Sequence, residues 1–293
     1  MLVGNYSSEN VTTDEDTELQ TSQWGLLLVK GNVSEESGGD RNKRVFWEGT
    51  YGLPCTSVGD HHDSLTGIIG SGGSGVKTKD GTLVFPVEGT KKKTTEGTEE
   101  AGKTVSLILY SSDAVSWTLS NRTAADGCSD PSILEWKDNQ LMMMTACDDG
   151  RRRVYESGDK GELWTEALGT LSRVWGNNDK RHERGVGSGF TTATIGDREV
   201  MLVTLPVYAK DGDKKKRNEK GELHLWLTDN THIVDIGPVS RNDDVSASSL
   251  LYKSGTNNDK KLIALYEKKG SEEAQSPGMV SVLLTDELQR VKD

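Results

Sequence analysis

The feature of this sequence that most constrains its fold is a succession of short apolar runs separated by turn residues. Runs such as 82–87 and 141–145 are rich in the aliphatic and aromatic side chains typical of strands. The order 192–195, then Gly196-Asp197, then 200–205 predicts a β-hairpin. Long segments with the 3.6-residue period of an amphipathic helix are nearly absent. The sequence therefore predicts an all-β protein, which leaves a sandwich, a barrel or a propeller.

A repeated turn pattern favours the propeller. The segment 157–164 has the form S-x-D-x-G-x-x-W, and 111–117 is a shorter copy that lacks the glycine and starts 46 positions earlier, about the length of one blade. Ser and Asp side chains can accept hydrogen bonds from turn N–H groups, Gly permits a positive φ, and Trp can pack back onto the blade. This reasoning assigns structural roles to Ser157, Asp159, Gly161, Trp164, Ser111, Asp113 and Trp117.

Charge and composition exclude several functions. The net charge is −11 and the pI is near 5.1, so the chain is a poor candidate for binding nucleic acid or anionic membranes. No segment is apolar enough to span a membrane, and neither a signal peptide nor an anchor signal is visible. Four sequons indicate possible N-glycosylation and point weakly to secretion; they begin at Asn5, Asn10, Asn32 and Asn121.

The metal-binding and disulfide-forming residues are few. With three cysteines, Cys55, Cys128 and Cys147, at least one is unpaired unless it pairs between chains. No two cysteines have the spacing of metal ligands, and the segment 61–63, His-His-Asp, is interpreted as a solvated turn. We therefore predict neither a metal nor a cofactor.

Several segments in a fixed order resemble the trypanosomal trans-sialidases of the sialidase superfamily. They are 127–136, 151–164, 169–176, 225–230 and 246–253. The resemblance extends from about Leu2 to about Leu288 and identifies the repeated turn as the Asp box of that family. It implies a partial six-bladed propeller with about four blades present. It also implies that residues 1–293 form one incomplete sialidase-like domain, without the family's N-terminal blades and its C-terminal lectin-like domain.

The resemblance also implies where the family's chemistry would lie. Sialidases bind the substrate carboxylate with three arginines, because a guanidinium offers two parallel N–H donors. They use a tyrosine nucleophile assisted by a glutamate, and an aspartate as the acid. The glutamate position falls at Asp130, the second arginine at Ala146, the third at Lys220 or Arg217, and the tyrosine at Ser248. No catalytic residue assignable in this chain is therefore intact.

Two tyrosines and a run of arginines are the obvious candidates to replace the lost nucleophile and the lost arginine clamp. Tyr252 and Tyr266 lie in apolar runs and are interpreted as packing residues. Successive side chains of a strand point to opposite faces, so the three arginines of 151–153 cannot converge on one carboxylate. The methionines of 142–144 are interpreted as strand core.

Three hypotheses follow for the function. The first is a non-catalytic protein of the cell surface, or a secreted one, that binds sialylated glycans or host surface or matrix proteins. The second is an active exo-α-sialidase or trans-sialidase, and the third is a truncated gene copy without a function of its own. Cell-surface placement rests on the resemblance and on the sequons.

Overall fold

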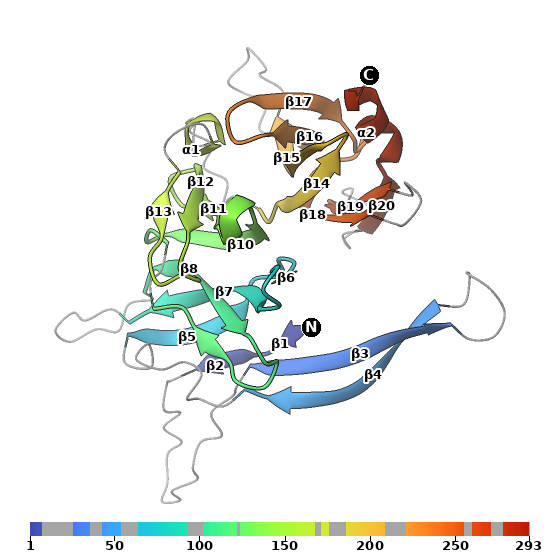
Figure 1. Ribbon diagram of the computed structural model, residues 1–293. Helices are drawn as coiled ribbons and strands as arrows, with labels where there is room; N and C mark the ends of the chain where they lie inside the picture. The colour runs from blue at the N-terminus through green and yellow to red at the C-terminus, as the bar shows by residue number, and fades with distance from the viewer. Residues whose placement is uncertain are drawn as a thin grey trace, which may run out of the picture.

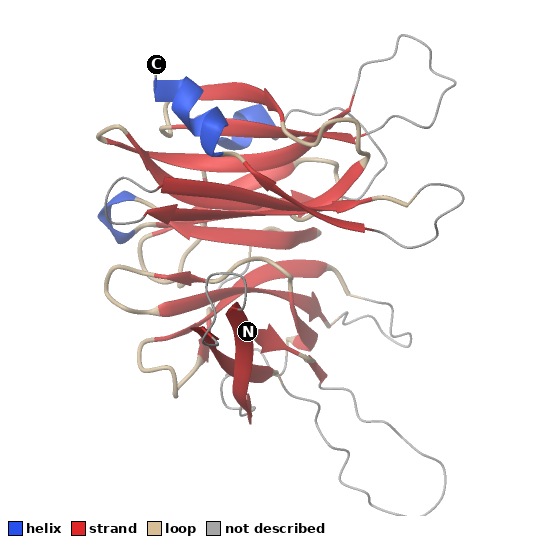
Figure 2. Cartoon of the chain, turned by 90° about the vertical axis from the view of Figure 1, so that its right-hand side faces the viewer, coloured by secondary structure: helices blue, strands red, loops and turns tan. Residues whose placement is uncertain are grey.

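The computed structural model describes residues 1–7, 26–35, 43–53, 64–92, 102–121, 124–167, 171–175, 186–208, 221–254, 260–270 and 278–292 (Figure 1). Strands form five antiparallel sheets, and the few helical segments are short (Figure 2). The predicted all-β class is confirmed. The helices are α1 (Leu171–Trp175) and α2 (Thr285–Lys292), with one 3-10 turn at Lys137–Asn139.

Sheets A and B share the N-terminal part of the chain, where one strand of sheet B lies in sequence between two strands of sheet A, and sheets C, D and E then follow one another. Sheet A contains β1 (Leu2–Val3), β3 (Leu27–Glu35) and β4 (Lys43–Gly52). Sheet B contains β2 (Asn5–Ser7), β5 (Leu65–Gly70), β6 (Val76–Lys77), β7 (Leu83–Lys91), β8 (Thr104–Ser111) and β9 (Thr118–Leu119). Sheet C contains β10 (Cys128–Glu135), β11 (Leu141–Cys147), β12 (Arg152–Ser157) and β13 (Thr165–Glu166). Sheet D contains β14 (Gly189–Ile195), β15 (Arg198–Tyr208), β16 (Gly221–Thr228) and β17 (Ile233–Pro238), and sheet E contains β18 (Val245–Ser254), β19 (Lys260–Lys268) and β20 (Gly278–Leu283).

Sheets B to E have the organisation of propeller blades. In sheets C, D and E each strand pairs with the next strand in the sequence, and sheet B contains the same meander from β7 to β9. Figure 1 shows these sheets following one another in an arc, with β10, β14 and β18 on its inner side. The β14–β15 hairpin has the predicted turn at Gly196, since Ile195 is paired with Arg198. The partial propeller with about four blades is therefore confirmed.

The hydrophobic core lies between successive sheets. Alternation along β11 sends Met142 and Met144 to the layer shared with sheet D and Met143 to the layer shared with sheet B. All three side chains are at most 1% exposed, which confirms their interpretation as strand core. Tyr266 belongs to the layer between sheets D and E, and Tyr252 packs against that layer.

The two predicted Asp boxes form turns that close the outer edge of sheets B and C. In the first, the Asp113 carboxylate accepts hydrogen bonds from the N–H groups of Val115 and Ser116 at 2.8 and 2.7 Å. In the second, Asp159 accepts from Leu163 N–H at 3.0 Å, and Gly161 N–H donates to Ser157 Oγ at 2.8 Å.

The glycine of the second Asp box is required by its surroundings. Gly161 has a φ of 86°, and an added Cβ would lie 2.8 Å from Ser120 Cβ. Trp117 is buried beside Phe85, with the ring centroids 5.7 Å apart, and Trp164 packs against the layer between sheets B and C. Both boxes therefore make the turn hydrogen bonds and packing contacts that a structural role requires.

A third turn of this kind was missed by sequence reasoning. It follows β16, where the Asp229 carboxylate accepts hydrogen bonds from Thr231 N–H at 2.8 Å and His232 N–H at 2.7 Å. These bonds hold the pKa of Asp229 at about 2. The segment has neither the serine two positions ahead nor the tryptophan, so only its position between the third and fourth strands reveals the relationship.

We expect Asp159→Asn to destabilise the fold by about 1 kcal/mol at pH 7, because the exposed turn loses a charge-assisted acceptor. Hydrogen bonds from Leu163 N–H and Ser157 Oγ lower the pKa of Asp159. A depressed pKa contributes stability above the unfolded value of 3.8 and loses it as the pH falls through the folded value. Chemical denaturation at pH 7 and at pH 2–3 measures this. The difference between the two proteins should shrink in acid, whereas the exposed Asp197→Asn control should match the wild type at pH 7.

Candidate functional site

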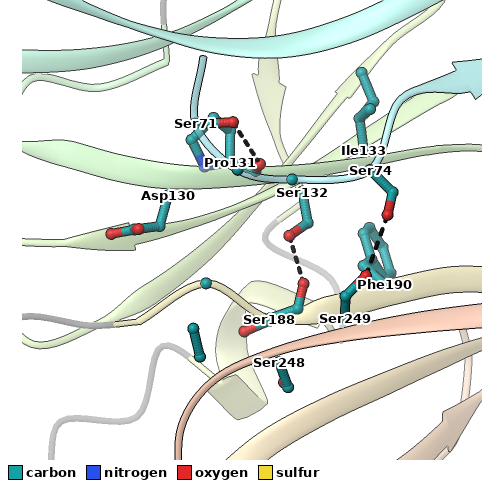
Figure 3. A pocket seen from close by; sticks show the side chains of 14 residues that line it. Ser71, Ser74, Asp130, Pro131, Ser132, Ile133, Ser188, Phe190, Ser248 and Ser249 are labelled. Atoms are coloured by element: carbon teal, nitrogen blue, oxygen red, sulfur yellow. Dashed lines mark hydrogen bonds between the residues drawn. The ribbon is translucent and has the colours of Figure 1, made fainter. Parts of the chain in front are cut away.

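A small cavity lies where the first strands of successive sheets meet (Figure 3). Its volume is about 120 Å³, which is less than the roughly 150 Å³ of a cavity that holds benzene. It is lined by residues 71–74, 130–133, 187, 188, 190 and 247–249, which come from the β5–β6 connection, β10, the start of β14 and β18. The cavity therefore has room for part of a sugar, such as a carboxylate with its neighbouring atoms.

Serine hydroxyls join the walls of this cavity to one another. Ser71 Oγ donates to Pro86 O at 3.0 Å, and Ser132 Oγ donates to Ser188 O at 2.5 Å, which links sheet C to the start of sheet D. Ser74 Oγ and Ser249 Oγ are 3.2 Å apart and link sheets B and E. The cavity is therefore walled by polar groups that the protein itself holds in place.

Asp130, which the sequence resemblance assigns to the family's glutamate position, lines this cavity. It has a φ of 50° and lies in a bulge of β10 between Ser129 and Ser132. The Asp130 N–H donates to a Glu88 carboxylate oxygen at 2.9 Å, and Ser129 Oγ donates to the Asp130 carboxylate at 2.9 Å. A non-glycine residue with a left-handed backbone costs about 1–3 kcal/mol of folding free energy, and these two hydrogen bonds help to hold Asp130 in that conformation.

Ser248, which the sequence resemblance assigns to the family's tyrosine position, also lines the cavity. Its Oγ lies 2.9 Å from Thr204 Oγ1, and its N–H donates to Gly187 O at 3.0 Å. No described histidine lines the cavity: His224 lies in β16 beside Asp235, and His232 lies in the β16–β17 turn beside Asp229. A serine hydroxyl without a neighbouring base is a weak nucleophile.

The sequence resemblance assigns Ala146 to the position of the family's second arginine. It lies in β11 between Ser129 of β10 and Arg152 of β12. These three residues are directly opposite one another and share one face of sheet C. Ala146 is 2% exposed, so neighbouring groups cover its methyl group.

Arg152 extends from the same row toward the start of β14. Its Nη2 donates to Val186 O at 2.6 Å, and its Nη1 donates to Ser188 Oγ. Burial lowers the pKa of Arg152 to about 10, and the nearby Asp130 carboxylate opposes that decrease, so the guanidinium is charged at neutral pH. In the sequence, Arg152 stands out only as part of the run 151–153, and strand alternation does not show which of the three approaches the cavity.

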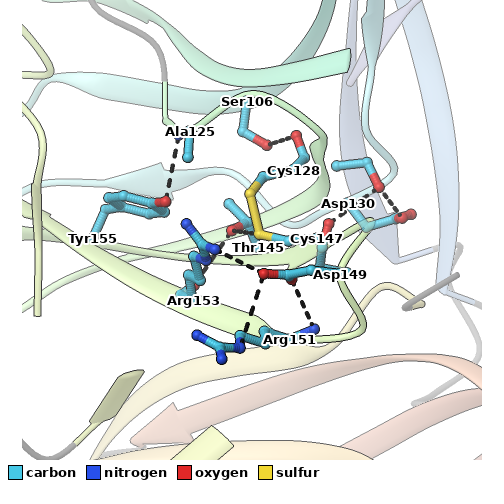
Figure 4. Close-up of a disulfide and its surroundings, with 12 residues drawn as sticks. Ser106, Ala125, Cys128, Asp130, Thr145, Cys147, Asp149, Arg151, Arg153 and Tyr155 are labelled. Atoms are coloured by element: carbon cyan, nitrogen blue, oxygen red, sulfur yellow. Dashed lines mark hydrogen bonds and ion pairs between the residues drawn. A yellow bond between two sulfur atoms is a disulfide. The ribbon is translucent and has the colours of Figure 1, made fainter. Parts of the chain in front are cut away.

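Arg151 and Arg153 face away from Arg152, as the alternation predicts. Arg153 Nη2 lies 2.8 Å from an Asp149 carboxylate oxygen, and Arg151 Nε lies 3.9 Å from the same oxygen (Figure 4). The prediction that the three arginines do not converge on one anion is confirmed. Of the three, Arg152 is the one that donates to a residue of the cavity wall, Ser188.

A disulfide joins β10 to β11 close to Asp130. Cys128 and Cys147 are directly opposite in the two strands, with their Cα atoms 4.0 Å apart (Figure 4). The sequence left the pairing open. Cys55 lies outside the described residues.

The remaining candidates lie away from the cavity or outside the described part of the chain. Tyr266 Oη donates to an Asp243 carboxylate at 2.8 Å, and burial together with this carboxylate raises its pKa to about 12. Tyr252 Oη donates to Thr194 O at 3.1 Å. Both phenols therefore have structural partners, as predicted. Four candidates, Lys220, Arg217, Asn10 and the segment 61–63, lie outside the described residues.

Three of the four sequon asparagines, Asn5, Asn32 and Asn121, lie within the described residues. Asn32 and Asn121 are exposed, and each side-chain amide donates to a glutamate, Glu48 and Glu162 respectively. The backbone of Asn5 lies in β2. Glycosylation at these sites stays a prediction. Within the described ranges, no group of three or more His, Cys, Asp or Glu side chains is arranged to hold a metal, and no helix is long and apolar enough to cross a bilayer.

The fold and the cavity at the meeting point of its blades define a propeller of the sialidase type. A family model described as a BNR repeat-like domain matches residues 1–267. A Trypanosoma cruzi sialidase is 35% identical over 274 residues, which cover 91% of this chain and 22% of the relative. A second relative from that organism, Sialidase 85-1.1, is 33% identical over 91% of this chain and 34% of its own length. The chain belongs to the BNR repeat-like family, within the sialidase and trans-sialidase superfamily.

Solved structures agree with this assignment. Trypanosoma rangeli sialidase in complex with sialic acid superposes with a TM-score of 0.74 at 32% identity, covering 99% of this chain and 43% of the other. The same sialidase with the inhibitor DANA gives a TM-score of 0.76 and covers 44% of that chain. The chain thus spans less than half the length of these relatives.

Proposed function

We propose that this chain is part of a non-catalytic, trans-sialidase-like protein that binds sialylated glycans at the cell surface or after secretion. The observation that carries the proposal is Ser248. The sequence resemblance assigns it to the family's tyrosine nucleophile; it lines the cavity, and its hydroxyl lies 2.9 Å from Thr204 Oγ1. Ala146 provides no guanidinium where the family has its second arginine.

The shape of the cavity also supports binding rather than turnover. Ligand sites that enclose a whole small molecule measure about 300–1,000 Å³, and this cavity measures about 120 Å³. It can accept one polar end of a sugar while the rest remains at its mouth. Hydrolysis requires the reacting carbon to be held within about 3–3.5 Å of a nucleophile, and the described cavity lining offers only serine hydroxyls and the Asp130 carboxylate for that role.

Binding to a sialylated and a desialylated form of one glycoprotein tests the proposal. We expect the chain, immobilised on a biosensor, to bind the sialylated form and to lose that binding after enzymatic removal of sialic acid. Equal binding to both forms, or binding to neither by a chain shown to be folded, would contradict glycan recognition through sialic acid. A preference for desialylated glycan would point to the underlying sugars instead.

A further inference from the structure

Resting on the proposed function, we propose that Arg152 and Ser188 together form the carboxylate-binding element of this cavity, with Arg152 supplying the charge that Ala146 cannot. The ligand group is the carboxylate of a sialic acid.

The strand register places Arg152 where it can take over from Ala146. The two residues are direct cross-strand partners, so their side chains leave the same face of sheet C. An arginine at 146 would start one strand, or about 4.8 Å, closer to the inner side of the blade. Residue 146 is alanine and contributes no long side chain to this face, and the Arg152 guanidinium reaches Val186 and Ser188, just before β14.

The hydrogen bonds of Arg152 fix the guanidinium and connect it to the cavity. One terminal nitrogen donates to Val186 O at 2.6 Å, which anchors the group, and the other donates to Ser188 Oγ. Two of the five N–H donors of a guanidinium are thereby used. The Ser188 oxygen is an acceptor in this contact, so its own proton is available for a second acceptor.

Ser188 lies between the guanidinium and the cavity. It is among the residues that line the cavity, and it is 5% exposed. Its carbonyl is held by Ser132 Oγ at 2.5 Å. A carboxylate in the cavity would accept the Ser188 hydroxyl proton while the Arg152 charge stabilises the pair from behind. The residues that line the cavity in the described part of the chain include no lysine, arginine or histidine, and Arg152 is connected to the cavity through its hydrogen bond to Ser188 Oγ.

The test compares the affinities of 3′-sialyllactose and of the same sugar with its carboxylate reduced to an alcohol. We expect wild type to bind the acid and to bind the alcohol about 10- to 100-fold more weakly, as for loss of one charge-assisted hydrogen bond. Arg152→Met and Ser188→Ala should each lose about the same factor for the acid and little for the alcohol. The matched control Arg153→Met, which removes a guanidinium facing the other way, should stay within about twofold of wild type.

The outcomes separate this inference from the proposed function. Equal affinity of wild type for acid and alcohol, or an Arg152→Met protein that binds the acid as wild type does, overturns the role of Arg152 and leaves glycan binding intact. A folded wild type that binds neither sugar overturns both. If Arg152→Met does not fold, the wild-type comparison of the two sugars and the Ser188→Ala protein decide the question.

Discussion

Removal of the Cys128–Cys147 disulfide is expected to destabilise the chain by about 3 kcal/mol, which corresponds to a decrease in Tm of roughly 6–12 °C. The bridge closes a loop with a sequence separation of 19 and joins two neighbouring inner strands of sheet C. Its loss increases the conformational freedom of the unfolded chain, and both cysteines are at most 5% exposed in the fold. The variant that tests this is Cys128→Ala/Cys147→Ala, studied by thermal unfolding.

Two comparisons make the disulfide result decisive. Wild type unfolded under reducing conditions should approach the Tm of the double variant, and Cys55→Ala, which leaves the bridge intact, should keep the Tm of oxidised wild type. Titration of free thiols should find one per chain under denaturing, non-reducing conditions. Three free thiols, or a Tm that reduction does not change, would show that the pair does not form a stabilising bridge.

Gly189→Ala is expected to cost about 2–3 kcal/mol and to weaken glycan binding at the same time. An added Cβ would lie 2.7 Å from Leu250 Cγ and 2.8 Å from Leu250 N, and it would also contact Thr204 Oγ1. Two of these three atoms belong to β18, so β14 and β18 would have to move apart. The hydrogen bond from Gly189 N–H to Thr204 Oγ1, 3.1 Å long, would be strained as well.

The position of Gly189 explains why binding should change together with stability. It follows Ser188 directly, and its N–H also lies 3.4 Å from Ser248 Oγ, so a shift of this strand displaces two groups of the cavity wall. The control is Gly278→Ala, where an added Cβ has no neighbour within 4 Å and the expected change is within about 0.5 kcal/mol. Denaturation curves and a sialyllactose titration measure both effects. A Gly189→Ala protein as stable as the control would contradict the close packing of β14 against β18.

The blades were predictable from the sequence because their signals are local. A strand run, a turn and an Asp box each lie within a few residues, so 157–164 predicts its own turn without knowledge of the rest of the chain. The turn at Asp229 was missed because its hydrogen bonds form from a different local pattern. Asp113 and Asp229 both have a carboxylate that accepts two consecutive N–H groups, and residue spacing alone does not reveal this likeness.

The cavity could be predicted only in part. The resemblance placed Asp130 and Ser248 as equivalents of family residues, and both line the cavity. The serines from four segments meet there through the arrangement of blades, which leaves no local pattern. Arg152 differs from Arg151 and Arg153 only in its strand face, and its partners Val186 and Ser188 lie 34 and 36 positions further along the chain.

The most direct test of the central claim, that this propeller binds without catalysing hydrolysis, is a turnover assay on a fluorogenic sialoside with and without lactose as acceptor. The chain should first be shown to be folded by circular dichroism, and an active sialidase should serve as the positive control. The account predicts no fluorophore release above that of the heat-inactivated chain, because the resemblance assigns Ser248 and Ala146 to the positions of the nucleophile and of one anchoring arginine. Release that survives repurification and disappears in a cavity variant such as Asp130→Asn would contradict the account and show that the site is catalytic.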